Sequence, residues 1–402
     1  MAKVPRGERL VLTLIGKRNA GKSSLINAMT GQEISIVSDT PGTTTDPVAK
    51  AYELLPLGPV TIYDTAGIDD VGDLGQQRVK KTRKILFRTD VAILVTDSTE
   101  VDEDLETIIS DLKEMKVPFI IAFNKNDLNP LPKATREYCK DNNIAYASVS
   151  GTSGDGVRML KEKLVTLVPS TLTHENNLVS DLLRPGQLVV LVVPIDLAAP
   201  KGRLILPQVQ VLREVLDSDA VGIIVKEREL EKALAGLSRK PDLVITDSQV
   251  VLKVVGDIPP DVRFTTFSTL FARYKGDFET LVNGAQAIDN LKDGSKILIA
   301  EACSHHTQAD DIGTVKIPRW MRQFTGKELI FEKSAGNDFP ENLEEYDLVL
   351  HCGSCMLNQI EMKRRIMECQ RRGVPISNYG VTISKLHGVL DRVIEPFFMR
   401  SR

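Results

Sequence analysis

The sequence is poor in cysteine and contains no long apolar run. Five cysteines among 402 residues are too few and too unevenly placed for the disulfide framework of a secreted domain. The longest apolar stretch, Leu188 to Pro194, is far shorter than the roughly 20 residues of a membrane span and is typical of a strand. Residues 1–10 lack the apolar segment of a secretory signal. We therefore expect no membrane partner and a cytoplasmic location.

An excess of charge of one sign is also absent. The chain carries 51 Lys and Arg residues against 54 Asp and Glu residues, for a net charge of −3. Proteins that bind nucleic acid over a wide surface usually carry a basic stripe or domain, so nucleic acid is not an expected partner. Hydrophobic residues make up 42% of the chain and charged residues 26%, which is ordinary for a globular protein. At roughly 150 residues per domain the length predicts two or three domains, and we expect three.

The first part of the chain, from Arg9 to about Val168, alternates short β-branched runs with longer amphipathic stretches. This alternation predicts an α/β fold with a parallel sheet. A polar stretch, Pro169 to Asn177, interrupts the rhythm and is predicted to be a linker. The runs expected to be strands are Val11 to Ile15, Val60 to Tyr63, Val91 to Thr96, Phe119 to Phe123 and Ile144 to Ala147.

Two smaller α/β units with mainly parallel sheets are expected after the linker. The first ends near the Pro259-Pro260 pair, and the second begins around Phe264. The predicted domain ranges are 1–170, 178–262 and 264–402. In the last unit the elements that matter most are the predicted strands Lys296 to Ala302 and Asp347 to Leu350 and the predicted helices Met356 to Arg372 and Val381 to Ile394.

A phosphate-binding motif stands in the first unit. Gly16 to Ser23 match the pattern GxxxxGK[ST] directly after one predicted strand and directly before a predicted helix. In such a loop the backbone N–H groups surround the β-phosphate, Lys22 bridges the β- and γ-phosphates, and Ser23 ligates Mg²⁺. The motif and its context predict a P-loop nucleotide-hydrolysing domain.

Two later motifs complete the predicted nucleotide site, and the second of them selects guanine. Asp64 in Asp-Thr-Ala-Gly is placed in the outer shell of Mg²⁺, and the Gly67 amide near the γ-phosphate. In Asn-Lys-Asn-Asp, the Asp127 carboxylate can accept both N1–H and N2–H of guanine, a donor pair that adenine lacks. The predicted nucleotide-binding residues are Asn19, Ala20, Gly21, Lys22, Ser23, Ser24, Asp64, Gly67, Asn124, Lys125, Asp127, Ser150 and Gly151.

A threonine-rich loop lies between these motifs. The segment Pro41 to Asp46 has the composition of a switch that becomes ordered on the γ-phosphate, and Thr44 is its predicted Mg²⁺ ligand. The predicted catalytic residues are Lys22, Thr44 and Gly67. Gly151 stands where alanine is commoner in the loop that contacts the base, and because a backbone amide makes that contact we expect little to be lost.

These motifs resemble the bacterial translation-factor class of GTPases, most closely the Era and tRNA-modification branch. Ile68 follows Gly67 where Ras-like enzymes place a water-orienting Gln, and Gln76 or Gln77 is a candidate for that role. Asn19 occupies the position that ligates K⁺ in the potassium-activated members, or is simply a polar residue that the loop tolerates. The resemblance implies slow GTP hydrolysis that potassium stimulates.

Three cysteines in the last unit form a candidate metal site. Cys303 follows one predicted strand, and Cys352 and Cys355 follow another, so all three stand at the carboxyl ends of strands, where open α/β sheets bind ligands. If the two strands are neighbours, the sulfurs converge. With His305 and His351 nearby, zinc and an iron–sulfur cluster are both chemically satisfactory, while a redox pair and three thiols without a ligand remain alternatives. Two cysteines are expected to be ordinary helix residues, Cys139 and Cys369.

The arrangement Cys-Ser-His at 303–305 followed by His-Cys-Gly-Ser-Cys at 351–355 resembles the CxH…HCxxC signature of the HydF family of [FeFe]-hydrogenase maturation GTPases. The order of the three units matches as well. The resemblance implies a [4Fe-4S] cluster on Cys303, Cys352 and Cys355 and a middle domain that mediates homodimerisation. It further implies a scaffold that receives a di-iron precursor made with the radical-SAM maturases HydE and HydG and delivers it to apo-[FeFe]-hydrogenase.

Three thiolates leave one iron of a cubane cluster with a different ligand. The candidates are His305 and His351, either of which can instead support the site without touching the metal. The oxygen alternatives are Glu301, Asp310 and Asp311. The competing hypotheses are an RNA- or ribosome-associated GTPase with a structural Cys₃His zinc site, and a redox regulator that uses Cys352 and Cys355 as a dithiol.

Overall fold

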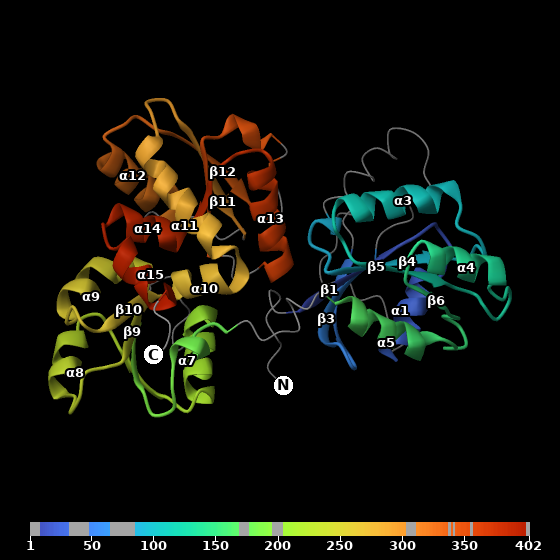
Figure 1. The fold of residues 1–402 in the computed structure, drawn as a ribbon, viewed down its shortest axis with the longest axis horizontal. Coiled ribbons are helices and arrows are strands. Elements are labelled where there is room, and N and C mark those ends of the chain that lie inside the picture. The colour runs from blue at the N-terminus through green and yellow to red at the C-terminus, as the bar shows by residue number, and fades with distance from the viewer. Residues whose placement is uncertain are drawn as a thin grey trace. The chain divides into compact units, whose positions relative to one another are not determined.

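A computed structural model describes most of the chain, and its contacts divide it into two compact units, Met1–Glu175 and Asn176–Arg402 (Figure 1). The division falls inside the polar stretch that was predicted to be a linker. None of the described helices is long and apolar enough to cross a membrane. The described residues are 9–31, 48–64, 85–168, 177–194, 204–302, 311–336, 339–340, 342–353 and 357–398.

The described part of the first unit contains a six-stranded sheet in the order β2-β3-β1-β4-β5-β6. Strand β2 runs antiparallel to β3, and the other neighbours are parallel. The strands are β1 (Leu10–Ile15), β2 (Val48–Leu54), β3 (Gly58–Asp64), β4 (Val91–Thr96), β5 (Phe119–Phe123) and β6 (Tyr146–Ser148). The helices are α1 (Lys22–Thr30), α3 (Glu103–Glu114), α4 (Lys133–Asp141) and α5 (Val157–Leu167).

Strand β4 explains why this sheet is covered on both faces. Its alternate residues enter two different apolar clusters: Ile93 packs in the cluster that contains α1 and α5, and Leu94 in the cluster that contains α3 and α4. Both side chains are fully buried. A strand buried on both sides is apolar throughout, which is the pattern that predicted a parallel α/β sheet.

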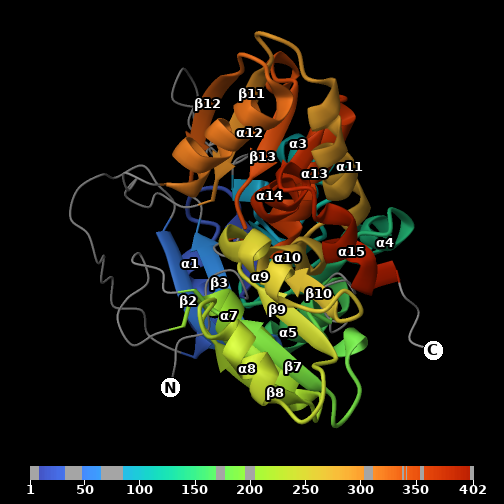
Figure 2. The ribbon, with the colours of Figure 1, turned by 90° about the vertical axis from the view of Figure 1, so that its left-hand side faces the viewer.

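The described part of the second unit contains two four-stranded parallel sheets, in the orders β10-β9-β7-β8 and β12-β11-β13-β14 (Figures 1 and 2). The strands are β7 (Leu188–Val192), β8 (Val221–Val225), β9 (Leu243–Thr246), β10 (Arg263–Thr266), β11 (Lys296–Glu301), β12 (Ile330–Ala335), β13 (Leu348–His351) and β14 (Ile376–Asn378). The helices are α7 (Leu206–Asp217), α8 (Leu230–Gly236), α9 (Val251–Asp257), α10 (Phe267–Lys275), α11 (Phe278–Gln286), α12 (Ile317–Thr325), α13 (Gln359–Arg371), α14 (Tyr379–Leu386) and α15 (Leu390–Phe398). The fold class predicted from the sequence is confirmed.

Two elements differ from the sequence-based expectation. Strand β10 pairs with β9, so the second sheet continues past residue 262, where the middle domain was expected to end; the three domain ranges stay a prediction. The single helix expected from Val381 to Ile394 is interrupted between α14 and α15, where Gly388 has a positive φ of 69° that suits a helix end.

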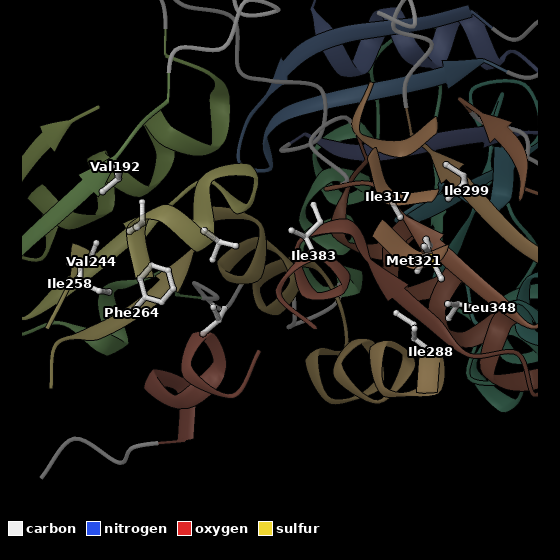
Figure 3. Packing of buried hydrophobic residues seen from close by; sticks show 14 of the residues in the cluster. Val192, Val244, Ile258, Phe264, Ile288, Ile299, Ile317, Met321, Leu348 and Ile383 are labelled. Carbon is white, nitrogen blue, oxygen red and sulfur yellow. The ribbon is translucent and has the colours of Figure 1, made fainter. Parts of the chain in front are cut away.

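One apolar cluster joins the two sheets of the second unit. Phe264 comes from the second sheet and Leu348 from the third, and Ile317, Met321 and Ile383 of α12 and α14 lie in the same cluster (Figure 3). All five side chains are buried. A shared core means that these two sheets belong to one folding unit, Asn176–Arg402.

Candidate functional site

The Lys22 side chain is hydrogen-bonded to the backbone of the phosphate-binding loop that contains it. Lys22 is buried, and its Nζ donates to the carbonyl oxygens of Gly16 at 2.7 Å and Lys17 at 2.8 Å. Gly21 has φ 89°, and a Cβ there would lie 2.2 Å from Nδ2 of Asn124. Only glycine satisfies both the conformation and the space at that position. The ammonium is therefore held inside the loop, at the place where the motif puts the phosphates.

The two side chains predicted to associate with Mg²⁺ lie side by side. Ser23 Oγ donates to Asp64 Oδ2 at 3.1 Å. The pKa of the Asp64 carboxyl is raised, because the effect of burial outweighs the opposing effects of the Ser23 hydrogen bond and the charge of Lys22. A half-buried carboxylate beside a hydroxyl oxygen offers the oxygen donors that Mg²⁺ prefers. Thr44 and Gly67, like Ile68, Gln76 and Gln77, lie outside the described residues.

Asn124 connects three loops of the nucleotide site. Its Nδ2 donates to the Ala20 carbonyl oxygen at 2.9 Å, and its Oδ1 accepts the Gly151 backbone N–H at 2.9 Å. Within this motif, the sequence predicted a chemical role only for Asp127, which is exposed at the end of the same motif. The sequence signal for the role of Asn124 was its position in the motif, three residues before Asp127.

The presence of glycine at position 151 has a steric explanation. A Cβ at this position would lie 2.8 Å from the Leu25 backbone nitrogen and 3.0 Å from the Ser24 carbonyl carbon. The loop that should contact the base therefore packs against the backbone of α1 so closely that the commoner alanine does not fit without a shift.

Asn19 has a positive φ of 63° and an exposed side chain. Asparagine tolerates the left-handed region better than most residues, so the backbone alone gives a reason for its presence. Its neighbour Lys17 forms ion pairs with Asp102 at 2.9 Å and Asp104 at 2.8 Å. These two carboxylates raise the pKa of Lys17.

The structure brings the two cysteine-bearing strand ends together. Strands β11 and β13 are parallel neighbours, with Ala300 opposite His351. Cys352 donates its backbone N–H to the Ala300 carbonyl oxygen at 2.9 Å, and its Sγ accepts the N–H of Ala302 at 3.1 Å. Four of the predicted site residues lie outside the described residues, namely Cys303, His305, Asp310 and Cys355. Within the described part of the chain, no three His, Cys, Asp or Glu side chains gather as a metal site.

His351 is fully buried and both of its ring nitrogens have protein partners. Nε2 lies 3.0 Å from Arg365 Nη1, and because a guanidinium can only donate, Nε2 is the acceptor. Nδ1 lies 2.9 Å from the Cys352 carbonyl oxygen and donates to it. Burial first, and the charge of Arg365 second, lower the pKa of His351 to about 3. Of the two roles predicted for this histidine, the geometry favours support of the cysteine loop over ligation.

Arg365 was missed by the sequence analysis. Its Nη2 pairs with Glu361 Oε1 at 2.8 Å, and the two side chains are only 2% and 6% exposed. The guanidinium also lies 5.0 Å from the Phe339 ring centroid. The spacing of four residues between Glu361 and Arg365 on a predicted helix was a signal for the pair, although not for its burial.

The described oxygen candidates for a fourth ligand already have partners. Glu301 Oε2 pairs with Lys333 Nζ at 2.7 Å, and Asp311 Oδ1 accepts the N–H and the hydroxyl of Thr314, each at 2.8 Å. Burial raises the pKa of Tyr379, and the negative charges of Cys352, Glu301 and Asp311 raise it further. The Tyr379 phenol therefore stays protonated, and its hydroxyl lies 3.4 Å from Glu301 Oε1.

Three family models match consecutive parts of the chain. The model described as "50S ribosome-binding GTPase" matches residues 11–125. The model described as "Hydrogen maturase F dimerization domain" matches residues 178–276, and the one described as "Hydrogen maturase F tetramerization domain" matches residues 279–396. The last two together match more than half of the chain.

Individual relatives resemble the first part. The tRNA modification GTPase MnmE of Coxiella burnetii is 32% identical over 43% of this chain and 38% of its own length, and that of Carboxydothermus hydrogenoformans is 35% identical over 48% and 45%. The chain thus spans less than half the length of these relatives. Among solved structures, the G domain of the T. maritima FeoB iron transporter is 26% identical over 40% of this chain and 98% of its own, with a TM-score of 0.33. Era of Aquifex aeolicus is 18% identical over 54% and 92%, with a TM-score of 0.34.

Proposed function

The chain belongs to the hydrogen maturase F family and its first unit is a GTPase, and from that premise we propose that it is a GTP-hydrolysing scaffold of [FeFe]-hydrogenase maturation. In this proposal the second unit holds a [4Fe-4S] cluster on Cys303, Cys352 and Cys355 and carries a di-iron precursor as cargo. HydE and HydG are the proposed sources of that cargo, and apo-[FeFe]-hydrogenase is its proposed recipient. The cytoplasmic location stays a prediction.

The observation that carries this proposal is the contact between Cys352 Sγ and the N–H of Ala302 at 3.1 Å. Cys303 follows Ala302 directly, and consecutive Cα atoms are about 3.8 Å apart. A shared metal centre would need the Cys303 thiol to reach the Cys352 sulfur, and the contact at Ala302, the residue before it in the sequence, supports that requirement. A backbone N–H that points at a cysteine sulfur also stabilises the thiolate form, which is the form that binds metal.

The residues around Cys352 fit an iron–sulfur cluster. When bound on three thiolates, such a cluster supplies one iron with an exchangeable ligand, which suits a cargo that must later be released. His351 fixes the carbonyl of Cys352, and Arg365 in turn fixes the ring of His351. These two residues would orient the loop, and the buried guanidinium would add positive charge next to an anionic centre.

The first unit would act as a switch. A nucleotide can shift a conformational equilibrium only by the difference in its affinity for the two states. Lys22, Ser23 and Asp64 are the described side chains positioned to distinguish a γ-phosphate with its Mg²⁺. We propose that hydrolysis resets partner binding and leaves the cluster chemically untouched.

A homodimer through the middle domain is the proposed assembly, in keeping with the model described as a dimerization domain, which matches residues 178–276. Strand β8 supports it, because β8 ends the order of its sheet and carries Val221 and Ile224 at 50% and 44% exposure. An edge strand with exposed apolar residues can pair with the same strand of a second copy.

The test of the proposed function is anaerobic purification followed by an absorption spectrum and iron and zinc analysis. We expect a brown protein with about four irons per chain, the content of one cubane cluster. Stoichiometric zinc in a colourless protein would contradict the scaffold proposal and would favour a structural zinc site.

Potassium dependence is a separate expected result. Replacing Asn19 by alanine should remove the stimulation of GTP hydrolysis by K⁺ relative to Na⁺, because the side-chain oxygen proposed to ligate the ion is lost. Turnover is measured in matched potassium and sodium buffers, and Asn19→Asp retains an oxygen at the same place as a control. If Asn19→Ala keeps the full difference between the two ions, Asn19 serves only the backbone conformation of the loop.

A further inference from the structure

One carboxylate holds the backbone at the start of the described part of the second unit. The entry segment, residues 177–182, is the first described stretch after the linker. Glu214 Oε1 on α7 accepts the backbone N–H groups of Leu178, Val179 and Ser180 at 2.8, 2.9 and 2.9 Å. Hydrogen bonds to an ionised acceptor are stronger than neutral ones, so the backbone of the entry segment has a fixed position on this unit.

Arg273, in the last turn of α10, holds the same segment from a second side. Its Nη1 and Nη2 bind the two carboxylate oxygens of Asp181 at 2.6 and 2.7 Å. Nη2 also donates to the carbonyl oxygens of Leu178 at 3.0 Å and Asn177 at 3.2 Å. The guanidinium stacks 4.8 Å from the ring centroid of Phe397. A bidentate, stacked arginine fixes both the distance and the direction of the segment that it binds.

The next two residues of the same helical turn bind the segment that follows the cysteines. Lys275 is buried, and its Nζ donates to the Leu357 carbonyl oxygen at 3.0 Å. The Tyr274 carbonyl oxygen accepts from Nε2 of Gln359, the first residue of α13, at 2.6 Å. Leu357 lies two residues after Cys355 in the sequence. Burying an ammonium costs desolvation free energy, so the hydrogen bond from Lys275 to this carbonyl oxygen is a specific feature of the fold.

We propose that the last turn of α10 couples the entry segment to the cysteine loop, with Arg273 and Lys275 as positioning residues. This inference rests on the proposed function and specifies how the nucleotide state would reach the metal site. Arg273, Tyr274 and Lys275 are consecutive in one helical turn and move as a body. The covalent chain that comes from the first unit enters the second unit at the entry segment. Arg273 binds this segment, so a displacement transmitted along the chain acts on Arg273. A displacement there shifts Lys275, and with it the backbone beside the cysteines.

Hydrogen exchange of the full-length protein tests this coupling. Backbone exchange of the peptide that covers residues 357–364 is compared in GDP and in a non-hydrolysable GTP analogue. In the native chain we expect exchange to differ between the two nucleotides by about fivefold or more, the lower end of usual allosteric coupling. In Arg273→Ala and in Lys275→Met the difference should fall below about twofold, because the first removes the guanidinium from the entry segment and the second removes the hydrogen bond to the Leu357 carbonyl oxygen. Arg273→Lys, which retains the charge but not the bidentate geometry, should lose most of the difference as well.

The control is Lys240→Ala, which removes an exposed ion pair with Asp261 in the same unit and should keep the full nucleotide difference. A variant that merely loosens packing raises exchange equally in both nucleotides and leaves their ratio unchanged, and that outcome at Arg273 overturns the proposal. Absence of any nucleotide effect in the native chain overturns it too. Neither result touches the scaffold proposal, which the iron analysis decides.

Discussion

Replacing Lys22 by alanine is expected to lower the rate of GTP hydrolysis by about 10²–10³-fold, the usual cost of losing one preorganised group that stabilises transition-state charge. Lys22 Nζ already lies inside the loop, on the carbonyl oxygens of Gly16 and Lys17. The ammonium is therefore held inside the loop, where the motif puts the phosphates. Phosphate release at saturating GTP and Mg²⁺ measures the effect, and a thermal melt checks that the variant is folded.

The matched control is Lys17→Ala in the same loop. Lys17 is exposed and is paired with Asp102 and Asp104. Exposed ion pairs contribute at most about 1 kcal/mol, which corresponds to roughly a fivefold change in rate. If the two variants lose activity equally, the conformation of the loop is what matters, and the catalytic role of Lys22 is wrong.

Much of the nucleotide site was predictable because its motifs depend on local chain order. Each motif follows a buried strand, and the ends of neighbouring parallel strands meet at one edge of a sheet. The structure accordingly puts Ser23 beside Asp64 and brings the loop of Gly151 to α1. The role of Asn124 was not predictable in the same way, since side-chain hydrogen bonds that bridge loops leave no periodic pattern in the sequence.

The metal site on the cysteines stays a prediction, and the meeting of the strand ends that it requires was predicted only under a condition. Cys303 and Cys352 converge if their strands are neighbours, and strand order does not follow sequence order. In the chain β12 comes between β11 and β13, yet the sheet places β12 on the far side of β11. That order depends on tertiary packing, which short apolar runs do not encode individually.

The function of His351 was undecidable from sequence for a similar reason. Its partner Arg365 lies 14 residues away on a helix, and the pair forms only because α13 packs against the sheet that ends in His351. Strand β10 was missed because it has only four residues, Arg263–Thr266, and two of them are polar threonines that are nonetheless fully buried. Burial of polar side chains is a property of the finished fold.

Replacing Cys352 by serine should remove most of the iron from the purified protein and its visible absorption. Loss of a direct ligand should weaken metal binding by more than the 10–100-fold that is typical when a residue that only hydrogen-bonds to a ligand is lost. Serine is the sharpest substitution because its hydroxyl oxygen can still accept the Ala302 N–H that Cys352 Sγ accepts at 3.1 Å. The local backbone is therefore retained while the thiolate is lost.

Cys369 provides the matched control for this experiment. It is buried inside α13 in the same unit, and burial raises the pKa of its thiol to about 12, which disfavours the thiolate form that metal binding needs. Cys369→Ala should retain about four irons per chain, the content of one cubane cluster, at the cost of some stability. Full iron in Cys352→Ser would mean that the centre is held elsewhere, and the contact between Cys352 and Ala302 would then serve only the end of strand β11.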